Sequence, residues 1–147
     1  MEPQARLDDL IARLKDRGCH MTPQRMAVIR ALVTSHEHPT VEQLYAQVKA
    51  DFPMTSLATV YKTLTLLKEM GEVLEISLGD GTNRYDGAVP RPHPHLICVR
   101  CWRIADLVGP AQSRLPTRAA ERSGYQVLGY RLDFFGVCPQ CQKNTSS

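Results

Sequence analysis

The sequence predicts an α+β fold, in which an N-terminal winged helix-turn-helix domain precedes a small C-terminal α/β domain with a four-cysteine zinc site. Three observations support this prediction. Helical segments with apolar stripes precede one hairpin pattern, a proline-rich stretch follows the hairpin, and two Cys-x-x-Cys pairs lie beyond it. The predicted boundaries are a winged helix over 1–86, a linker over 87–92 and a second domain over 93–147.

Four helices are predicted in the first domain. The first has apolar residues at i, i+3, i+4 and i+7, namely Leu7, Leu10, Ile11 and Leu14. The next three begin at Thr22, Thr40 and Ser56, because a hydroxyl there can accept a hydrogen bond from the first helical turn. The last of them ends near Met70, and a helical wheel divides it into a buried side with Leu57, Val60, Leu64 and Leu67 and an exposed side with Thr59, Lys62 and Leu66.

A hairpin follows the fourth helix. Leu74, Ile76 and Leu78 alternate with polar residues, residues 79–81 supply a Gly-Asp-Gly turn, and residues 82–85 return as a second strand. Helices followed by a hairpin are the order of a winged helix, in which the fourth helix is the recognition helix. Its hydroxyls and lysine can contact phosphates and base edges. A structural bundle with a solvated helix face is the alternative.

The second domain is predicted to mix strands with one helix. Residues 103–107 indicate a short strand, residues 111–123 a helix, and residues 124–135 one or two further strands. This pattern predicts a small α/β unit.

Two cysteine pairs are the strongest chemical motif in the chain. Cys98 and Cys101 form one Cys-x-x-Cys pair, and Cys138 and Cys141 form the other. Four thiolates satisfy tetrahedral zinc, so a structural zinc site is predicted. Two redox pairs or two disulfides are the alternative. Cys19 stands alone and is expected to be a small buried apolar residue.

Histidines and aspartates near the first cysteine pair form a second candidate metal site. His93 and His95 share one side of an extended segment, with Asp86 before them and Asp106 after them. His38 lies in the other domain. Imidazole and carboxylate donors suit Fe(II), Mn(II) or Zn(II), although each residue alone could be an ordinary surface group.

An enzyme is the competing hypothesis, since an open His/Asp metal site can activate water for hydrolysis. The sequence contains no nucleophile motif, no His-Glu-x-x-His and no phosphate-binding glycine loop. A His/Asp metal-dependent hydrolase is therefore the distant alternative, and the protein is predicted not to be an enzyme.

Composition excludes some classes of protein. The chain has 147 residues and a formal net charge of +3, with its basic residues scattered and no run long enough to span a membrane. The N-terminal segment lacks the layout of a secretory signal, so a cytoplasmic location without a membrane partner is expected. The small positive charge is compatible with nucleic acid binding without arguing for it.

Several motifs together resemble the ferric uptake regulator family. They lie over residues 21–25, 38–40, 56–64, 84–86, 93–98 and 136–141. The resemblance implies a transcriptional repressor that binds an AT-rich palindromic operator in double-stranded DNA when loaded with metal. It also implies a homodimer, with the C-terminal domain as the dimerisation domain.

Within that family the chain is most similar to the peroxide-sensing regulators. The resemblance implies one regulatory Fe(II) or Mn(II) ion, beside structural Zn(II), and its ligands would be His38, Asp86, His93, His95 and Asp106. With Fe(II) bound, hydrogen peroxide would oxidise His38 or His93 and the DNA would be released. A manganese- or iron-responsive repressor of metal uptake genes, without peroxide sensing, is the alternative.

The resemblance also bears on DNA contacts. It implies a base contact by Tyr61, which the helical wheel places at the edge of the buried side. Thr59 and Lys62 are expected to face outward with Thr63 at the boundary, and Arg25 is expected to contact phosphate. Two departures are Trp102, where the family commonly has glycine, and one extra residue between the positions of Asp86 and His93.

Overall fold

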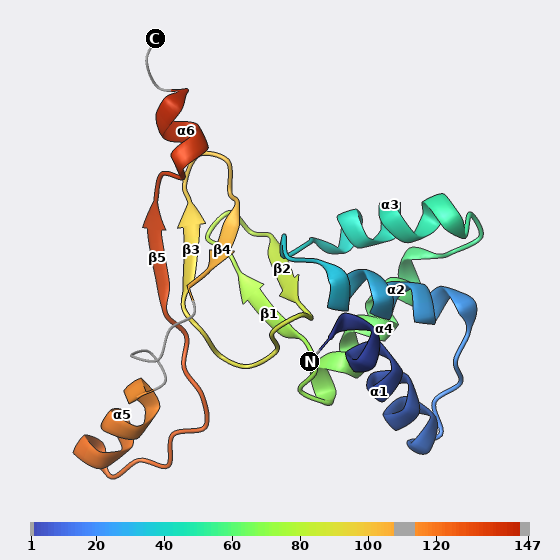
Figure 1. Cartoon of the computed structure of the whole chain (residues 1–147), viewed down its shortest axis with the longest axis horizontal. Helices are drawn as coiled ribbons and strands as arrows, with labels where there is room; N and C mark the ends of the chain where they lie inside the picture. The colour runs from blue at the N-terminus through green and yellow to red at the C-terminus, as the bar shows by residue number, and fades with distance from the viewer. Residues whose placement is uncertain (1, 108–113, 145–147) are drawn as a thin grey trace. The chain divides into compact units, whose positions relative to one another are not determined.

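The computed structural model describes residues 2–107 and 114–144, and the chain divides into two compact units, Met1–Pro90 and Arg91–Ser147. The described part of the first unit has four helices and a two-stranded sheet (Figure 1). These elements are α1 (Pro3–Asp16), α2 (Pro23–Thr34), α3 (Val41–Asp51), α4 (Leu57–Glu69), β1 (Leu74–Ser77) and β2 (Asn83–Asp86).

The predicted capping residues begin the helices of the first unit. The Thr22 hydroxyl accepts a hydrogen bond from the Arg25 N–H at 3.1 Å, and the Ser56 hydroxyl accepts one from the Thr59 N–H at 3.2 Å. Thr40 and Gln43 form a reciprocal capping box at the start of α3. The predicted starts of α2, α3 and α4 are therefore confirmed.

One apolar core lies among these helices, with α2 contacting α1, α3 and α4. Its least exposed side chains include Leu10, Leu14, Ile29, Leu32, Leu44, Val60 and Leu67. The wheel prediction for α4 was wrong at two positions, because Leu57 is 40% exposed and Leu66 packs against the core. The buried face of α4 is centred towards Thr63, which is fully buried, and not towards Leu57.

The hairpin carries the end of the first unit to Asp86. β1 pairs antiparallel with β2, with Leu74 opposite Asp86 and Ser77 opposite Asn83. Gly81 takes a left-handed conformation in the turn, where a side chain would be strained. The predicted hairpin is confirmed, with its second strand one residue further along the chain.

The second unit has a three-stranded sheet in the order β4-β3-β5. Its described elements are β3 (His95–Cys98), β4 (Ile104–Asp106), α5 (Leu115–Ser123), β5 (Asp133–Gly136) and α6 (Pro139–Lys143). β3 pairs antiparallel with β4 and parallel with β5. Sequence reasoning did not predict β3 or α6, and residues 111–113 of the predicted helix lie outside the described residues.

Across residues 2–107 and 114–144, no helix has the length and apolar character needed to cross a membrane.

Candidate metal centres

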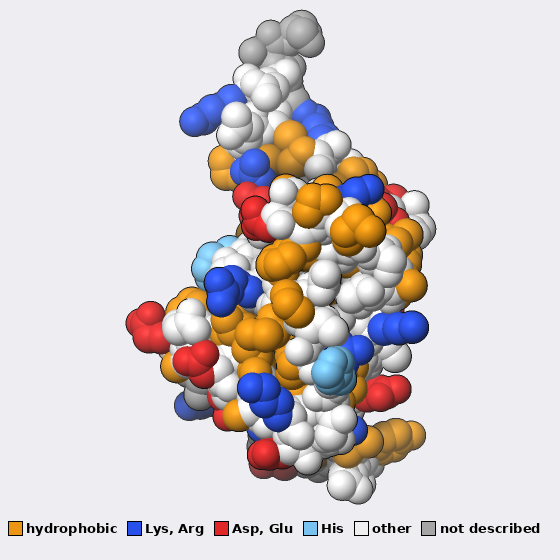
Figure 2. Space-filling view, turned by 90° about the vertical axis from the view of Figure 1, so that its right-hand side faces the viewer, with side chains coloured by type: hydrophobic (Ala, Val, Ile, Leu, Met, Phe, Trp, Pro, Cys, Tyr) orange, Lys and Arg blue, Asp and Glu red, His pale blue; other side chains and the backbone are white. Residues whose placement is uncertain are grey.

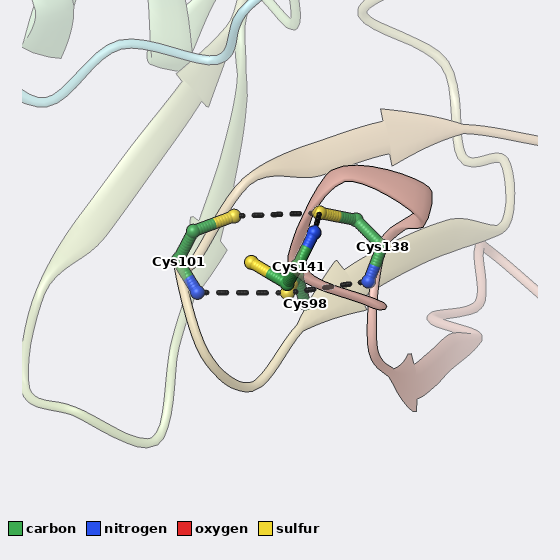
Figure 3. Close-up of side chains that lie close together, drawn as sticks. All are labelled: Cys98, Cys101, Cys138 and Cys141. Carbon is green, nitrogen blue, oxygen red and sulfur yellow. Dashed lines mark hydrogen bonds between the residues drawn. The ribbon is translucent and has the colours of Figure 1, made fainter. Parts of the chain in front are cut away.

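The parallel pairing of β3 and β5 brings the two cysteine pairs to one edge of the sheet. Cys98 ends β3 and lies opposite Gly136, the last residue of β5. Two residues beyond Gly136, Cys138 caps the N-terminus of α6, and its sulfur accepts a hydrogen bond from the Cys141 N–H at 3.5 Å. Two pairs that are 37 residues apart at Cys101 and Cys138 therefore meet in space (Figure 3).

The four sulfur atoms all lie within 4.8 Å of one another, and the four cysteines are free thiols. The Sγ atoms of Cys101 and Cys138 are 3.7 Å apart. Zinc with tetrahedral Zn–S bonds of about 2.3 Å requires sulfur–sulfur distances of about 3.8 Å. The donors and their spacing therefore fit a zinc ion, whereas 3.7 Å is far too long for a disulfide bond.

Backbone N–H groups stabilise the thiolate form of two cysteines in this cluster, and thiolates bind cations. The N–H groups of Cys101 and Cys138 donate to Cys98 Sγ at 3.5 and 3.4 Å, which lowers the pKa of Cys98 to about 5. The pKa of Cys138 is also lowered, chiefly by the Cys141 N–H. The pKa of Cys141 is raised to about 12, first by its hydrogen bond with the Cys138 side chain. Negative charge is thus concentrated on sulfurs that backbone donors already stabilise.

The fifth cysteine belongs to a different environment. Cys19 is partly buried in the first unit, where it packs against the apolar core. Its backbone N–H donates to the Leu14 carbonyl oxygen at 3.0 Å. It is therefore a packing residue of the helical unit.

The first unit contributes one buried imidazole–carboxylate pair. His38 Nε2 lies 3.1 Å from Asp86 Oδ2. Asp86 Oδ1 accepts hydrogen bonds from the N–H groups of Ala88 and Val89 at 3.1 and 2.9 Å. His38 has a left-handed backbone, with φ of 55°, which is uncommon outside glycine and is enriched at functional sites.

The second unit contributes two histidines that converge on one carboxylate. His93 Nε2 lies 2.8 Å and His95 Nε2 3.5 Å from Asp106 Oδ1, and the ring centroids are 4.4 Å apart. The alternation predicted for the His-Pro-His segment places both imidazoles on one side, with His95 opposite Asp106 in the β3–β4 pairing.

The hydrogen bonds of His93 leave this group able to hold a cation. His93 Nδ1 lies 2.7 Å from the Arg91 carbonyl oxygen, which can only accept, so Nδ1 carries a hydrogen. In a neutral imidazole Nε2 then presents a lone pair, 2.8 Å from a carboxylate oxygen. Two lone pairs at that distance repel unless a proton or a metal ion lies between them. A metal ion there could also accept a nitrogen lone pair from His95, so these donors fit one.

Comparison with known proteins places this chain among metal-responsive regulators. The model of the ferric uptake regulator family matches residues 16–135. The chain belongs to the ferric uptake regulator family. It is 37% identical over 136 residues to the peroxide-responsive repressor PerR of Staphylococcus aureus (strain USA300), which covers 92% of this chain and 91% of that protein.

Two solved structures of this family are similar in sequence and fold. The Campylobacter jejuni peroxide stress regulator has 31% identity and a TM-score of 0.70, covering 92% of this chain and 98% of that chain. A zinc-bound manganese uptake regulator has 31% identity and a TM-score of 0.68, covering 90% of this chain and 98% of that chain.

Family membership makes the chain a metal-dependent, DNA-binding transcriptional regulator and not an enzyme, as the sequence predicted. Repressors of the family bind DNA and are dimeric.

Most of the residues that the sequence predicts to contact DNA lie on α4. Tyr61 is 47% exposed and Lys62 is exposed, while Thr59 is half-buried and lies 3.0 Å from the Ser56 hydroxyl. Thr63 does not face solvent: it is fully buried, and its hydroxyl donates to the Thr59 carbonyl oxygen at 2.7 Å. The guanidinium of Arg25 donates to the His20 carbonyl oxygen at 2.8 Å. Because it is 47% exposed, Tyr61 lies further outward than the helical wheel suggests.

Positive charge is dispersed on the one face of the molecule that Figure 2 shows. Figure 2 shows Lys and Arg side chains distributed singly between hydrophobic and polar groups on the face in view. This agrees with the scattered basic residues in the sequence and the net charge of +3.

Sequence reasoning missed the Arg91 carbonyl and Asp133 as neighbours of the histidines, because their positions depend on backbone pairing.

Proposed function

We propose that this protein is a peroxide-responsive repressor with one structural and one regulatory metal ion per chain. Cys98, Cys101, Cys138 and Cys141 would hold structural zinc. The regulatory ion, Fe(II) or Mn(II), would be held by His38, Asp86, His93, His95 and Asp106. The observation that carries the proposal is the convergence of His93 and His95 on Asp106, whose Oδ1 atom lies 2.8 Å from His93 Nε2 and 3.5 Å from His95 Nε2.

The donor set is compatible with iron or manganese at the regulatory site. The proposed set offers imidazole nitrogens and carboxylate oxygens with no thiolate, and such sets suit Fe(II) and Mn(II). The similarity to a peroxide-responsive repressor at 37% identity supports peroxide as the signal. Bound Fe(II) would activate hydrogen peroxide beside the histidine ligands, and in the net reaction the histidine that gains an oxygen atom would supply the two electrons that reduce the peroxide to water.

The proposed ligands come from both units, which supplies a regulatory principle. His38 and Asp86 precede the division at Pro90, and the other three residues follow it. An ion bound by all five favours the conformers in which both groups can reach it, and so shifts the population towards them. In a dimer this selection would set the spacing of the two recognition helices, and half-sites about one helical turn apart demand a fixed spacing.

The second unit is proposed as the dimerisation domain. β5 is an edge strand with Phe134 and Phe135 exposed by 44% and 62%. An edge strand with exposed aromatic residues is an incomplete surface, and a second copy can cover it.

The first unit is proposed to bind an AT-rich palindromic operator in the cytoplasm. Thr59, Tyr61 and Lys62 would face the major groove, and Arg25 would contact phosphate. Thr63 is left out of this set because its side chain is buried. We expect Lys62→Ala to weaken operator binding.

Peptide mass spectrometry tests the peroxide proposal. Protein loaded with Fe(II) is exposed briefly to dilute hydrogen peroxide, with Mn(II)-loaded protein as the control. We expect one oxygen atom to be added to the peptide with His38 or His93, while the second oxygen of the peroxide leaves as water. Unmodified histidines in protein shown to hold iron would contradict peroxide sensing.

A metal-level sensor is the second candidate. It is favoured by the 31% identity to a manganese uptake regulator. Operator binding that depends on Mn(II) or Fe(II) concentration, with no histidine oxidation, would support this alternative.

A further inference from the structure

Asp133 lies beside the proposed regulatory site without belonging to its ligand set. It is the first residue of β5 and pairs in register with His95 on the parallel strand β3. Side chains at paired positions of adjacent strands point to the same face of a sheet. The sheet therefore holds a carboxylate next to one of the two convergent histidines.

The two oxygens of Asp133 have different surroundings. Oδ2 accepts a hydrogen bond from Arg131 Nε at 2.7 Å. Oδ1 lies 3.9 Å from His95 Nδ1, and it is buried and accepts no hydrogen bond from the part of the chain that the structure describes. A buried carboxylate oxygen without a donor costs free energy. Arg131 thus holds the carboxylate, with its second oxygen towards the imidazole.

His93 shows what such a neighbour does. Both imidazoles direct Nε2 towards Asp106 and Nδ1 towards an oxygen atom. For His93 that oxygen is the neutral carbonyl of Arg91, at 2.7 Å. For His95 it is the carboxylate of Asp133. The two imidazoles of the His-Pro-His segment therefore have the same orientation. They differ in the oxygen next to Nδ1, which is neutral for His93 and belongs to a carboxylate for His95.

We propose that Asp133 positions His95 for the regulatory ion, by accepting the Nδ1–H of His95 when Nε2 binds metal. The inference rests on the regulatory site proposed above. A carboxylate partner fixes the tautomer and ring orientation of a metal-binding histidine and makes its other nitrogen a stronger donor. The present separation of 3.9 Å is longer than a hydrogen bond and is expected to close on metal binding. Asp133 itself does not contact the ion.

The test measures metal affinity in the full-length dimer with its zinc in place. Mn(II) is titrated into wild type, Asp133→Asn and Glu121→Gln, and free Mn(II) is followed by electron paramagnetic resonance. Loss of the carboxylate is expected to weaken Mn(II) binding roughly 10- to 100-fold. Glu121→Gln makes the same charge change on the exposed part of α5 and is expected to bind like wild type. Zinc content and dimer size are expected to be equal in all three.

Two further measurements separate positioning from a general effect of charge. The Asp133→Asn loss is expected to disappear in a His95→Ala background, and an equal loss there would overturn the proposal. The visible absorption of Co(II) in the site is expected to change in Asp133→Asn and to be restored in Asp133→Glu. If Asp133→Glu, which keeps the carboxylate, lost as much Mn(II) affinity as Asp133→Asn, the proposal would also be overturned. This comparison still applies if Asp133→Asn folds poorly.

The outcomes distinguish this inference from the function on which it rests. Wild-type protein that binds no Mn(II) would overturn the regulatory site and the role of Asp133 together. Wild-type protein that binds Mn(II), with Asp133→Asn unchanged in affinity and Co(II) spectrum, would overturn the role of Asp133 alone.

Discussion

The four-cysteine cluster and the histidine–aspartate groups reach their positions by different routes. The cysteines lie within one unit, where the parallel β3–β5 pairing and the start of α6 bring them together. The histidines and aspartates are divided between the two units. The position of the His38 imidazole depends on a left-handed backbone conformation. The positions of the His93 and His95 imidazoles depend on an extended segment next to β4.

This difference indicates separate roles for the two groups. Four thiolates from one unit, stabilised by backbone N–H donors, make a closed site that contributes to folding. The imidazoles and carboxylates are proposed above to hold a second ion, and binding of that ion would depend on the conformation of the chain. The first group therefore suits an ion that is held permanently, and the second an ion that is exchanged.

The largest expected effect is that of Cys98→Ser. Cys98 Sγ accepts two backbone hydrogen bonds and is buried, so a hydroxyl there removes a thiolate that the fold has already stabilised. We expect loss of the zinc ion, and with it the cooperative folding of the second unit and the dimer. Metal analysis of purified protein and gel filtration measure these losses.

Cys19→Ser is the matched control for that variant. It makes the same substitution in the core of the first unit and is expected to keep one zinc ion per chain. Trp102, the single tryptophan, follows Cys101 and supplies a fluorescence readout of zinc removal. If the Cys98→Ser protein were a dimer that still held zinc, the four cysteines would not form a site that folding requires. The distinction drawn above between a permanently held ion and an exchanged ion would then be wrong.

Local patterns explain why the first unit could be predicted so fully. The starts of α2, α3 and α4 depend on a hydroxyl and its own first turn, as at Thr22, Thr40 and Ser56, and these contacts span only three residues. The Cys-x-x-Cys and His-Pro-His motifs are equally local. Their residue types and spacing therefore carry the chemistry without knowledge of the fold.

Pairing over long distances explains what the sequence could not show. The alternation of apolar residues does not predict that β3 lies between β4 and β5. It also does not predict that β5 begins only at Asp133. The neighbourhood of His95 and Asp133 follows from that register, across 38 residues of sequence. The burial of Thr63 likewise follows from where the helices around α4 place the core.

A smaller effect is expected from Gly87→Ala, which changes no proposed ligand. A Cβ at Gly87 would lie 2.9 Å from Leu32 Cβ and 3.1 Å from the Leu32 backbone carbon, so the chain must shift. Such crowding costs about 1–3 kcal/mol of stability. The shift affects the N–H groups of Ala88 and Val89 that hold Asp86. Mn(II) affinity is therefore expected to fall roughly tenfold, with zinc unchanged.

Gly79→Ala is the control for crowding, because a Cβ there meets no atom within 4 Å. It is expected to keep the Mn(II) affinity and stability of wild type. If Gly87→Ala lost zinc before Mn(II), the support of Asp86 would not be the reason for its effect.

The smallest effect is expected from Glu72→Gln, which tests whether general loss of stability in the first unit weakens metal binding. The Glu72 carboxylate pairs with Arg13 and with Arg6, at 3.1 Å for Arg6, and these partners lower its pKa. At neutral pH we expect a loss of about 1 kcal/mol in unfolding free energy, measured from urea midpoints. Mn(II) affinity is expected to stay unchanged, since Arg6 can still donate to the Glu72 and Gly87 carbonyl oxygens.

The pH dependence of the Glu72→Gln difference checks its cause. A carboxylate with a lowered folded pKa contributes stability that is fully present above its ordinary value of 4.5 and is lost as pH falls through the folded value. The urea midpoints of wild type and variant should therefore differ most near neutral pH and converge in acid. A difference that persists in acid would mean that the glutamine disturbs packing. The variant would then no longer separate loss of stability from loss of metal binding.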